Sequence, residues 1–123
     1  MRFMMLVKAS DESEAGQLPS AALTEAMGKY NNDLVKAGVL LAADGLHPSS
    51  RGARVRFTSG GHTVTDGPFT ETKELVAGYW IIDVKSRDEA IEWAKRIPFE
   101  EGDEVELRQV FEACDDPEEL LIR

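Results

Sequence analysis

The order in which two kinds of hydrophobic periodicity follow one another constrains the fold of this chain more than any other feature. Apolar residues at helical spacing occur twice, in residues 20–37 and 86–97, and short strand-like runs flank each segment. Between the two halves lie two alternating runs, residues 54–58 and 62–66, joined by a glycine-containing turn. This order predicts an α+β fold, with two helices packed on one face of an antiparallel sheet.

The two predicted helices have recognisable starts and apolar faces. Ser20 caps the first helix, whose apolar residues recur at spacings of four, three and four: Leu23, Met27, Tyr30 and Leu34. Ser86 and Glu89 fit a capping box for the second helix. Its predicted apolar stripe is Ala90, Ile91, Ala94 and Ile97, with Trp93 at the margin. We expect residues 11–19 to form a loop and residues 116–122 to form a short tail helix.

Two strand-like segments are apolar on both sides, which points beyond a single subunit. In residues 3–7, Met4 and Leu6 alternate with apolar neighbours, and in residues 79–84, Trp80 and Ile82 alternate with Tyr79 and Ile81. Two helices on one face leave the other apolar face uncovered. Because such a face is usually covered by a partner or a ligand, we predict a homodimer in which the two sheets face each other.

Composition excludes several classes of protein. The chain has 123 residues and a mass of 13.6 kDa, and we expect a single domain over residues 1–123. Fourteen basic and 23 acidic residues give a net charge of −9, which argues against a nucleic-acid partner. No apolar run approaches the length of about 20 residues that spans a bilayer, so we expect no membrane span. The single cysteine, Cys114, cannot form an internal disulfide, and we predict a cytoplasmic protein.

Motifs for known cofactors are absent from the sequence. There is no phosphate-binding glycine loop, no dinucleotide-binding fingerprint, no nucleophile elbow and no cluster of histidine and cysteine at metal-ligand spacing. We therefore expect neither a cofactor nor a metal ion. The acidic neighbours of Cys114 would raise the pKa of its thiol, which disfavours a cysteine nucleophile.

The most specific sequence motif is Asp66-Gly67-Pro68-Phe69. With the flanking residues 65–74 and 78–80 it resembles the DGPF-domain branch of the YCII-related proteins. The resemblance extends over nearly the whole chain, through residues 1–8, 34–40, 45–48, 89–94 and 105–110. It implies a ferredoxin-like α+β fold that dimerises into an α/β barrel.

The resemblance also bears on activity. Shorter YCII-related members carry a His and an Asp proposed as an acid–base pair. The position of their His aligns near Tyr30 of this chain. The position of their Asp, which precedes a proline, is occupied here by Ile97, before Pro98. Many DGPF proteins are encoded beside extracytoplasmic-function sigma factors, which implies a regulatory role as an alternative to catalysis.

Asp66 and His47 are the candidate catalytic residues. A carboxylate held rigidly by the Gly67-Pro68 bend could act as a general base, with His47 as its proton partner. The alternative for Asp66 is structural, because aspartate often accepts hydrogen bonds from the backbone of a turn. For His47, and for the other histidine, His62, the alternative is a surface or packing role.

Most of the candidate ligand-binding residues lie in or after the same bend: Gly67, Phe69, Glu71, Lys73 and Glu74. Tyr30, on the first predicted helix, is the remaining candidate. Lys73 could bind an anion at the rim of a pocket, and the alternative for these charged residues is a solvated turn. Phe69 is expected to enter the core and anchor the bend, while Tyr79 and Trp80, like Tyr30, fit a cavity lining or plain core packing.

A small basic patch stands out against the acidic composition. The patch consists of Arg51, Arg54 and Arg56. Arg54 and Arg56 share a strand face and could bind an anion jointly, although pairing with nearby acidic residues is the more common outcome.

Two functions fit these observations. The first is a dimer that binds an unknown small molecule and carries out cofactor-free acid–base chemistry. The second is a non-enzymatic regulatory module whose partner is a protein such as a sigma factor.

Overall fold

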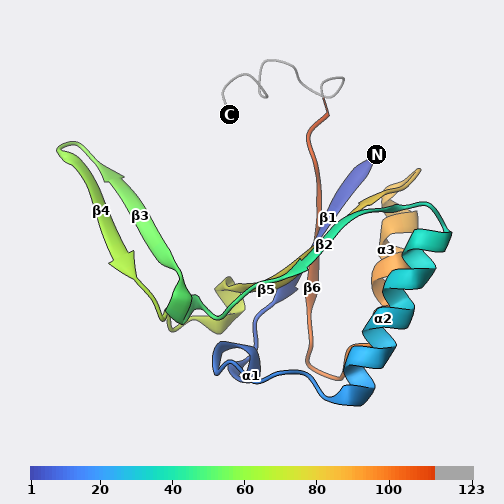
Figure 1. The fold of residues 1–123 in the computed structure, drawn as a ribbon. Helices are drawn as coiled ribbons and strands as arrows, with labels where there is room; N and C mark the ends of the chain where they lie inside the picture. The colour runs from blue at the N-terminus through green and yellow to red at the C-terminus, as the bar shows by residue number, and fades with distance from the viewer. Residues whose placement is uncertain (113–123) are drawn as a thin grey trace.

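A computed structural model describes residues 1–112 of the protein (Figure 1). Its elements in chain order are β1 (Arg2–Lys8), α1 (Asp11–Glu14), α2 (Ala21–Lys36), β2 (Leu40–Gly45), the 3-10 turn η1 (Ser49–Arg51), β3 (Ala53–Thr58), β4 (Gly61–Asp66), the 3-10 turn η2 (Thr72–Glu74), β5 (Val76–Asp83), α3 (Arg87–Lys95) and β6 (Val105–Gln109). Cys114 and the predicted tail helix lie outside the described residues.

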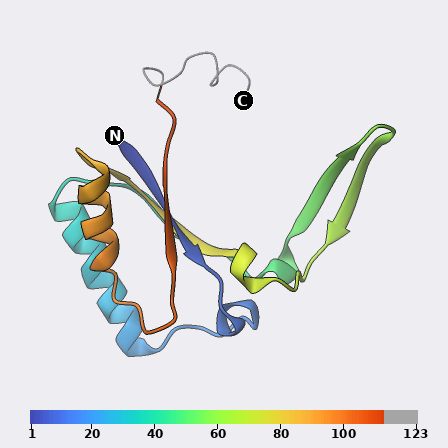
Figure 2. The same cartoon turned by 180° about the vertical axis from the view of Figure 1, so that it is seen from behind.

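Four strands form one antiparallel sheet in the order β2-β5-β1-β6. Helices α2 and α3 lie side by side on one face of this sheet (Figures 1 and 2). Without the hairpin, the order along the chain is β-α-β-β-α-β, the connectivity of ferredoxin-like proteins. The predicted α+β fold with two helices on one face of an antiparallel sheet is therefore confirmed.

Strands β3 and β4 form a separate two-stranded sheet, which we call the arm (residues 53–66). The hairpin itself is confirmed, with Val55 opposite Val64 and Phe57 opposite His62. It does not join the main sheet but extends away from it, on the side opposite the helices (Figures 1 and 2). Every residue of both arm strands is exposed.

The core lies between the main sheet and the two helices. Phe3 and Met5 from β1 and Trp80 and Ile82 from β5 are buried against the helices, as expected from the alternation of side chains along a strand. The remaining buried hydrophobic residues are Tyr30, Leu34, Val39, Val84, Ala90, Trp93 and Ile97. Of the predicted face of α2, Tyr30 and Leu34 are buried, whereas Leu23 and Met27 are half-buried.

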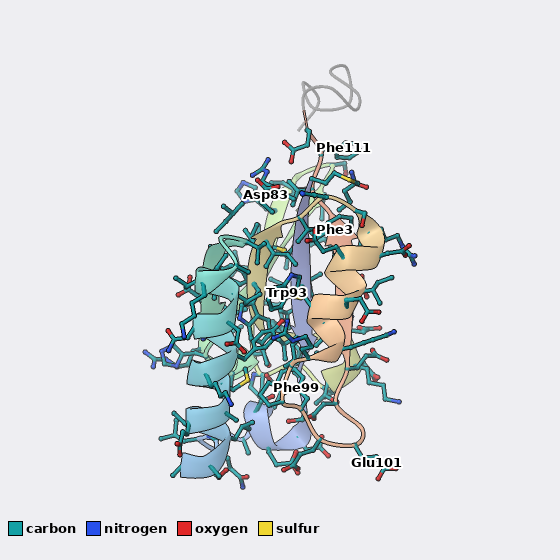
Figure 3. The ribbon with its side chains drawn as sticks, turned by 90° about the vertical axis from the view of Figure 1, so that its right-hand side faces the viewer. Phe3, Asp83, Trp93, Phe99, Glu101 and Phe111 are labelled. Carbon is teal, nitrogen blue, oxygen red and sulfur yellow. The ribbon has the colours of Figure 1, made fainter. Side chains whose placement is uncertain are left out.

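Trp93 corrects the predicted stripe of the second helix. It is buried in the core instead of lying at the margin, with its ring edge-on to that of Tyr30, and it lies between α2 and α3 in Figure 3. Ile91 and Ala94 are only half-buried. A wide indole fills the space between two helices, so the apolar stripe is broader than the spacing of its smaller residues indicated.

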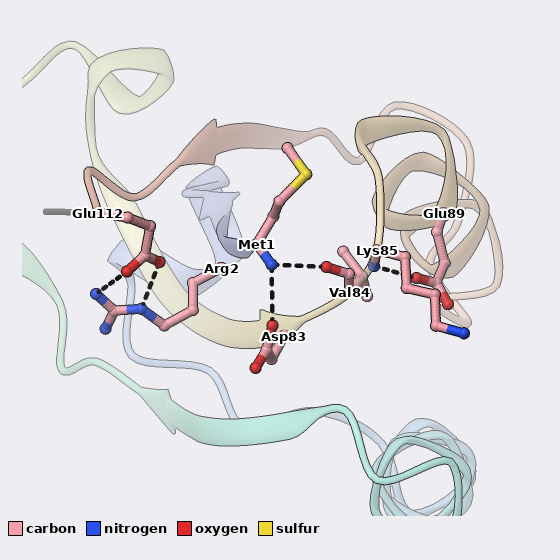
Figure 4. A network of polar contacts seen from close by, with 7 residues as sticks. All are labelled: Met1, Arg2, Asp83, Val84, Lys85, Glu89 and Glu112. Carbon is pink, nitrogen blue, oxygen red and sulfur yellow. Dashed lines mark hydrogen bonds and ion pairs between the residues drawn. The ribbon is translucent and has the colours of Figure 1, made fainter. Parts of the chain in front are cut away.

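The helix starts are partly as predicted. Ser20 Oγ accepts from the Leu23 amide, and Ser86 Oγ accepts from the Glu89 amide, both at 3.1 Å. The reciprocal half of the box at Ser86 is wrong, because the Glu89 carboxylate accepts from the Lys85 amide at 2.6 Å (Figure 4). Residues 11–14, predicted as loop, form α1, which a reciprocal capping box of Ser10 and Ser13 stabilises.

Polar contacts join the two ends of the described chain. The Met1 amino group lies 3.1 Å from Asp83 Oδ1, and Arg2 Nε donates to Glu112 Oε1 at 2.8 Å (Figure 4). These contacts fix the start of β1 beside the end of β5 and the segment after β6.

The face of the main sheet opposite the helices has an apolar centre. Met4 lies opposite Ile81 and Leu6 lies opposite Tyr79, and all four are half-buried. On the neighbouring strand, Arg108 and Glu106 pair with Met4 and Leu6. We call this surface the open face. Its pairing with a second copy stays a prediction at this point.

Candidate functional site

An apolar cavity of about 310 Å³ lies between α2 and the β2–β5 side of the main sheet. Leu23, Met27 and Asn31 line it from α2, successive positions that one helix face brings together. Trp80 lines it from β5, and Phe99 closes it from the segment after α3. The lining is therefore largely apolar and aromatic, as is typical of small-molecule sites.

One side-chain amide is held in place at this cavity. The Trp80 indole Nε1 donates to Asn31 Oδ1 at 2.8 Å. This bond orients the amide of Asn31, whose nitrogen makes no hydrogen bond to any residue from 1 to 112. Asn31 therefore presents two N–H donors at an otherwise apolar surface.

Two titratable residues, Asp44 and Tyr79, border the cavity. Their side chains lie on the open face, because the register sets Tyr79 opposite both Asp44 and Leu6. The Tyr79 hydroxyl donates to Asp44 Oδ2 at 2.9 Å. This hydrogen bond and the adjacent carboxylate charge raise the pKa of Tyr79, so its hydroxyl is held protonated as a donor. Of the three aromatic residues considered as a cavity lining, Trp80 lines it with its side chain, whereas the side chain of Tyr79 lies on the open face.

Tyr30, the third of these aromatic residues, is part of the core. Its hydroxyl donates to the Trp93 carbonyl oxygen at 2.8 Å, and its ring lies edge-on to Trp80 at 5.5 Å between centroids. Burial raises the pKa of Tyr30 to about 12, with the charge of Arg96 opposing the shift. The geometry gives Tyr30 a packing role that supports the Trp80 side of the cavity.

The two candidate catalytic residues lie away from this cavity, at the base of the arm. Asp66 ends β4 opposite Ala53 and is exposed. His47 is also exposed, with Nε2 3.4 Å from Nη1 of Arg51. Neither lines the cavity, and an acid–base pair of these two residues stays a prediction.

The Gly67-Pro68 bend packs directly on η1. The Gly67 amide donates to the Gly52 carbonyl oxygen at 3.0 Å. A Cβ atom at Gly67 would lie 1.8 Å from the Ser49 carbonyl oxygen, well inside van der Waals contact. The glycine is therefore required by close approach of two backbone segments, which supports the structural interpretation of the motif.

A three-segment hydrogen-bond node fixes the residues after this bend. The Phe69 amide donates to Ser49 Oγ at 2.9 Å, and Ser49 Oγ and the Ser49 amide both donate to the Glu14 carboxylate. These bonds lower the pKa of Glu14. Through this node α1, η1 and the Asp66–Phe69 motif are held together, although they are far apart in the sequence.

Phe69 and the basic patch differ from expectation. Phe69 is half-buried instead of entering the core. The guanidinium carbon of Arg54 lies over the Phe69 ring, 3.8 Å from the ring centroid. Within residues 1–112, Arg51, Arg54 and Arg56 form no ion pair, so the pairing expected for them is wrong. The arm thus carries arginine charge that its own subunit does not neutralise.

The other candidate binding residues lie in or beside η2. Lys73 lines a second, polar cavity together with Lys8 and Asp11. Glu71 and Glu74 are exposed. A ligand-binding role for these three residues stays a prediction.

We expect the Glu14 node to give an acid-sensitive contribution to stability. Its pKa is below the ordinary value of 4.5 in the folded protein, so the stabilisation is present above that value and is lost as pH falls through the folded pKa. The melting temperature of Glu14→Gln should therefore be lower than that of wild type at pH 7, and the gap should shrink below about pH 4.5.

The matched control is Glu12→Gln, in the same helix, where the carboxylate is exposed and makes no hydrogen bond or ion pair within residues 1–112. Differential scanning calorimetry from pH 7 to pH 3 measures both variants. A Glu14→Gln gap that stays constant over this range would contradict the role of its charge.

No group of three or more His, Cys, Asp or Glu side chains in residues 1–112 is arranged to hold a metal ion. No helix in the same range is long and apolar enough to cross a bilayer.

A comparison with known protein families identifies the family of this chain. The model of the YCII-related domain matches residues 1–113. The chain belongs to the YCII-related family. The match describes the family as a whole, and membership of the DGPF branch stays a prediction for this YCII-related protein.

Two individual proteins resemble this YCII-related protein. An uncharacterized protein of Rhizobium meliloti (strain 1021) is 43% identical over 61 residues, which are 50% of this chain and 49% of the relative, so the similar part spans about half of that protein. A 5-chloro-2-hydroxyhydroquinone dehydrochlorinase from Burkholderia phenoliruptrix AC1100, solved with 2,5-dihydroxybenzoquinone, is 16% identical with a TM-score of 0.45. That likeness covers 94% of this chain and 100% of the other.

The cavity residues that sequence reasoning missed are Asn31 and Phe99. Asn31 follows the buried Tyr30, but its partner Trp80 is 49 positions away, and no local pattern links them. Phe99 follows Pro98, beyond the predicted end of the second helix. Leu23 and Met27 were recognised as apolar face residues, and their half-exposure is what opens the cavity.

Proposed function

We propose that this YCII-related protein binds a small, largely apolar molecule in the cavity between α2 and the β2–β5 side of the sheet. The observation that carries the proposal is a preformed apolar cavity with one oriented amide. Its volume of about 310 Å³ falls at the lower end of the range of about 300–1,000 Å³ for ligand sites. A ligand of one or two rings suits this size.

The lining favours a neutral aromatic compound with a hydrogen-bond acceptor. Trp80 and Phe99, with ring centroids 6.3 Å apart, provide aromatic surfaces. The Asn31 amide supplies the donor, and the net charge of −9 disfavours an anion.

The test is a nuclear magnetic resonance titration with neutral one- and two-ring phenols such as 1-naphthol. The chain has two tryptophans, and only Trp80 lines the cavity. Binding should shift the indole N–H signal of Trp80 much more than that of Trp93. In Met27→Trp, an indole fills the cavity, and we expect affinity to fall by about tenfold or more.

The control is Lys29→Trp, which adds an indole at an exposed position of the same helix and should bind like wild type. Equal affinity in Met27→Trp and Lys29→Trp would contradict the proposal. So would a titration in which no compound of the series moves the Trp80 signal.

We also propose that the open face pairs with that of a second copy, giving the homodimer. Its apolar centre of Met4, Leu6, Tyr79 and Ile81 supports this assembly, because a contiguous apolar surface of this kind is usually covered. The alternative function, regulation through a sigma factor, stays a prediction, since none of the contacts described above bears on it.

A further inference from the structure

The arm is a hairpin that its own subunit does not support. A two-stranded sheet alone is marginally stable in water, because it has no second layer on which to bury side chains. All twelve residues of its strands are exposed, and its contacts with the rest of the chain are at its base, at Gly67 and Phe69. Something that the single subunit lacks must therefore stabilise the extended arm.

One face of the arm is apolar. The register places Val55 opposite Val64 and Phe57 opposite His62, so these four side chains share a face. Val55, Phe57 and Val64 are 52%, 79% and 63% exposed, among the most exposed large apolar residues from 1 to 112. The opposite face carries Arg54 and Arg56 among threonines.

The charge of the arm is complementary to that of the remaining chain. Residues 53–66 contain two arginines and one aspartate, whereas the rest of the chain contains 12 basic and 22 acidic residues. Arg54 and Arg56 make no ion pair within the described part of their own subunit. The arm is thus net positive and the rest of a second copy is net negative, which favours their association at long range, while the apolar face of the arm makes the contact.

We propose that the arm of each subunit packs its Val55–Phe57–Val64 face on a second copy of the chain, clasping the partner across the dimer. The arm extends on the side of the sheet that carries the open face (Figures 1 and 2). The arm can therefore contact a second copy that binds at the open face, and twofold symmetry makes this contact reciprocal. The proposal rests on the sheet-to-sheet dimer proposed above and adds to it a distinct interface.

The test compares two double variants by sedimentation velocity over nanomolar to high micromolar concentration. Phe57→Ser with Val64→Ser should raise the dimer dissociation constant about 100-fold, because aromatic anchors dominate such interfaces. The control, Leu18→Ser with Val35→Ser, removes equally exposed apolar residues outside the arm and should leave the constant within about twofold. Melting curves of dilute monomer check that each variant is folded.

Hydrogen exchange distinguishes failure of the clasp from failure of the dimer. We expect the arm amides and the main sheet to gain protection together as concentration rises. A dimer that protects only the sheet, with the arm variant as tight as wild type, overturns the clasp and leaves the dimer standing. A wild-type monomer at high micromolar concentration overturns both.

Arm-dependent binding to phosphatidylserine vesicles, with dimerisation unchanged in the arm variant, would assign the arm to a membrane surface and also overturn the clasp.

Discussion

Replacing Gly67 with alanine is expected to destabilise the protein by about 3 kcal/mol. The added Cβ would lie 1.8 Å from the Ser49 carbonyl oxygen and 2.6 Å from its carbonyl carbon. These are backbone atoms, which cannot turn away as a flexible side chain does. Relief requires η1 to move, and that movement breaks the hydrogen bonds of Ser49 to Phe69 and Glu14.

The matched control is Gly60→Ala at the tip of the arm, where no atom lies within 4 Å of the added carbon. Neither glycine has a positive φ, so the comparison isolates steric contact from backbone strain. Urea unfolding of both variants measures the free energy of unfolding. If both variants lose a similar small amount of unfolding free energy, the bend tolerates a side chain, and the steric requirement for Gly67 is contradicted.

Trp93→Ala is expected to lower the free energy of unfolding by about 3–5 kcal/mol. The indole is buried between α2 and α3, in edge contact with Tyr30 and under the guanidinium of Arg96. Its removal leaves a cavity that two packed helices cannot easily close. A margin position, as the helical spacing indicated, would lose much less.

Glu92→Ala is the control for this substitution, since it lies next to Trp93 on the same helix and is exposed. Its loss of a surface ion pair with Lys95 should change stability by less than about 0.5 kcal/mol. Guanidinium unfolding measures both variants. If Trp93→Ala lowers the free energy of unfolding no more than Glu92→Ala does, the buried position of the indole is contradicted.

The cavity and the Asp66–Phe69 motif are separate parts of the molecule, and this separation shapes the functional conclusion. The motif is fixed by Gly67 against η1 and by the Phe69 amide on Ser49. The cavity is formed by α2 and β5, with Asn31 bonded to Trp80. The Asp66–Phe69 motif thus holds the base of the arm, and none of its four residues lines the cavity.

Local patterns predicted the elements well where one principle dominated. Ser20 capped a helix as expected, because its hydroxyl satisfies an amide within the same turn. The alternation in residues 54–58 and 62–66 gave the hairpin. The patterns were weaker where two interactions compete locally, as at Glu89, whose carboxylate is bonded to the Lys85 amide instead of that of Ser86.

The sequence by itself determined the helices, the strands, their apolar faces and the α+β class, because these depend on residues a few positions apart. Only the tertiary structure decided that the hairpin stands outside the main sheet, that Glu14 and Ser49 hold the bend, and that Asn31 meets Trp80 beside a cavity. Such contacts join residues tens of positions apart, and the space left between packed elements depends on all of their side chains together.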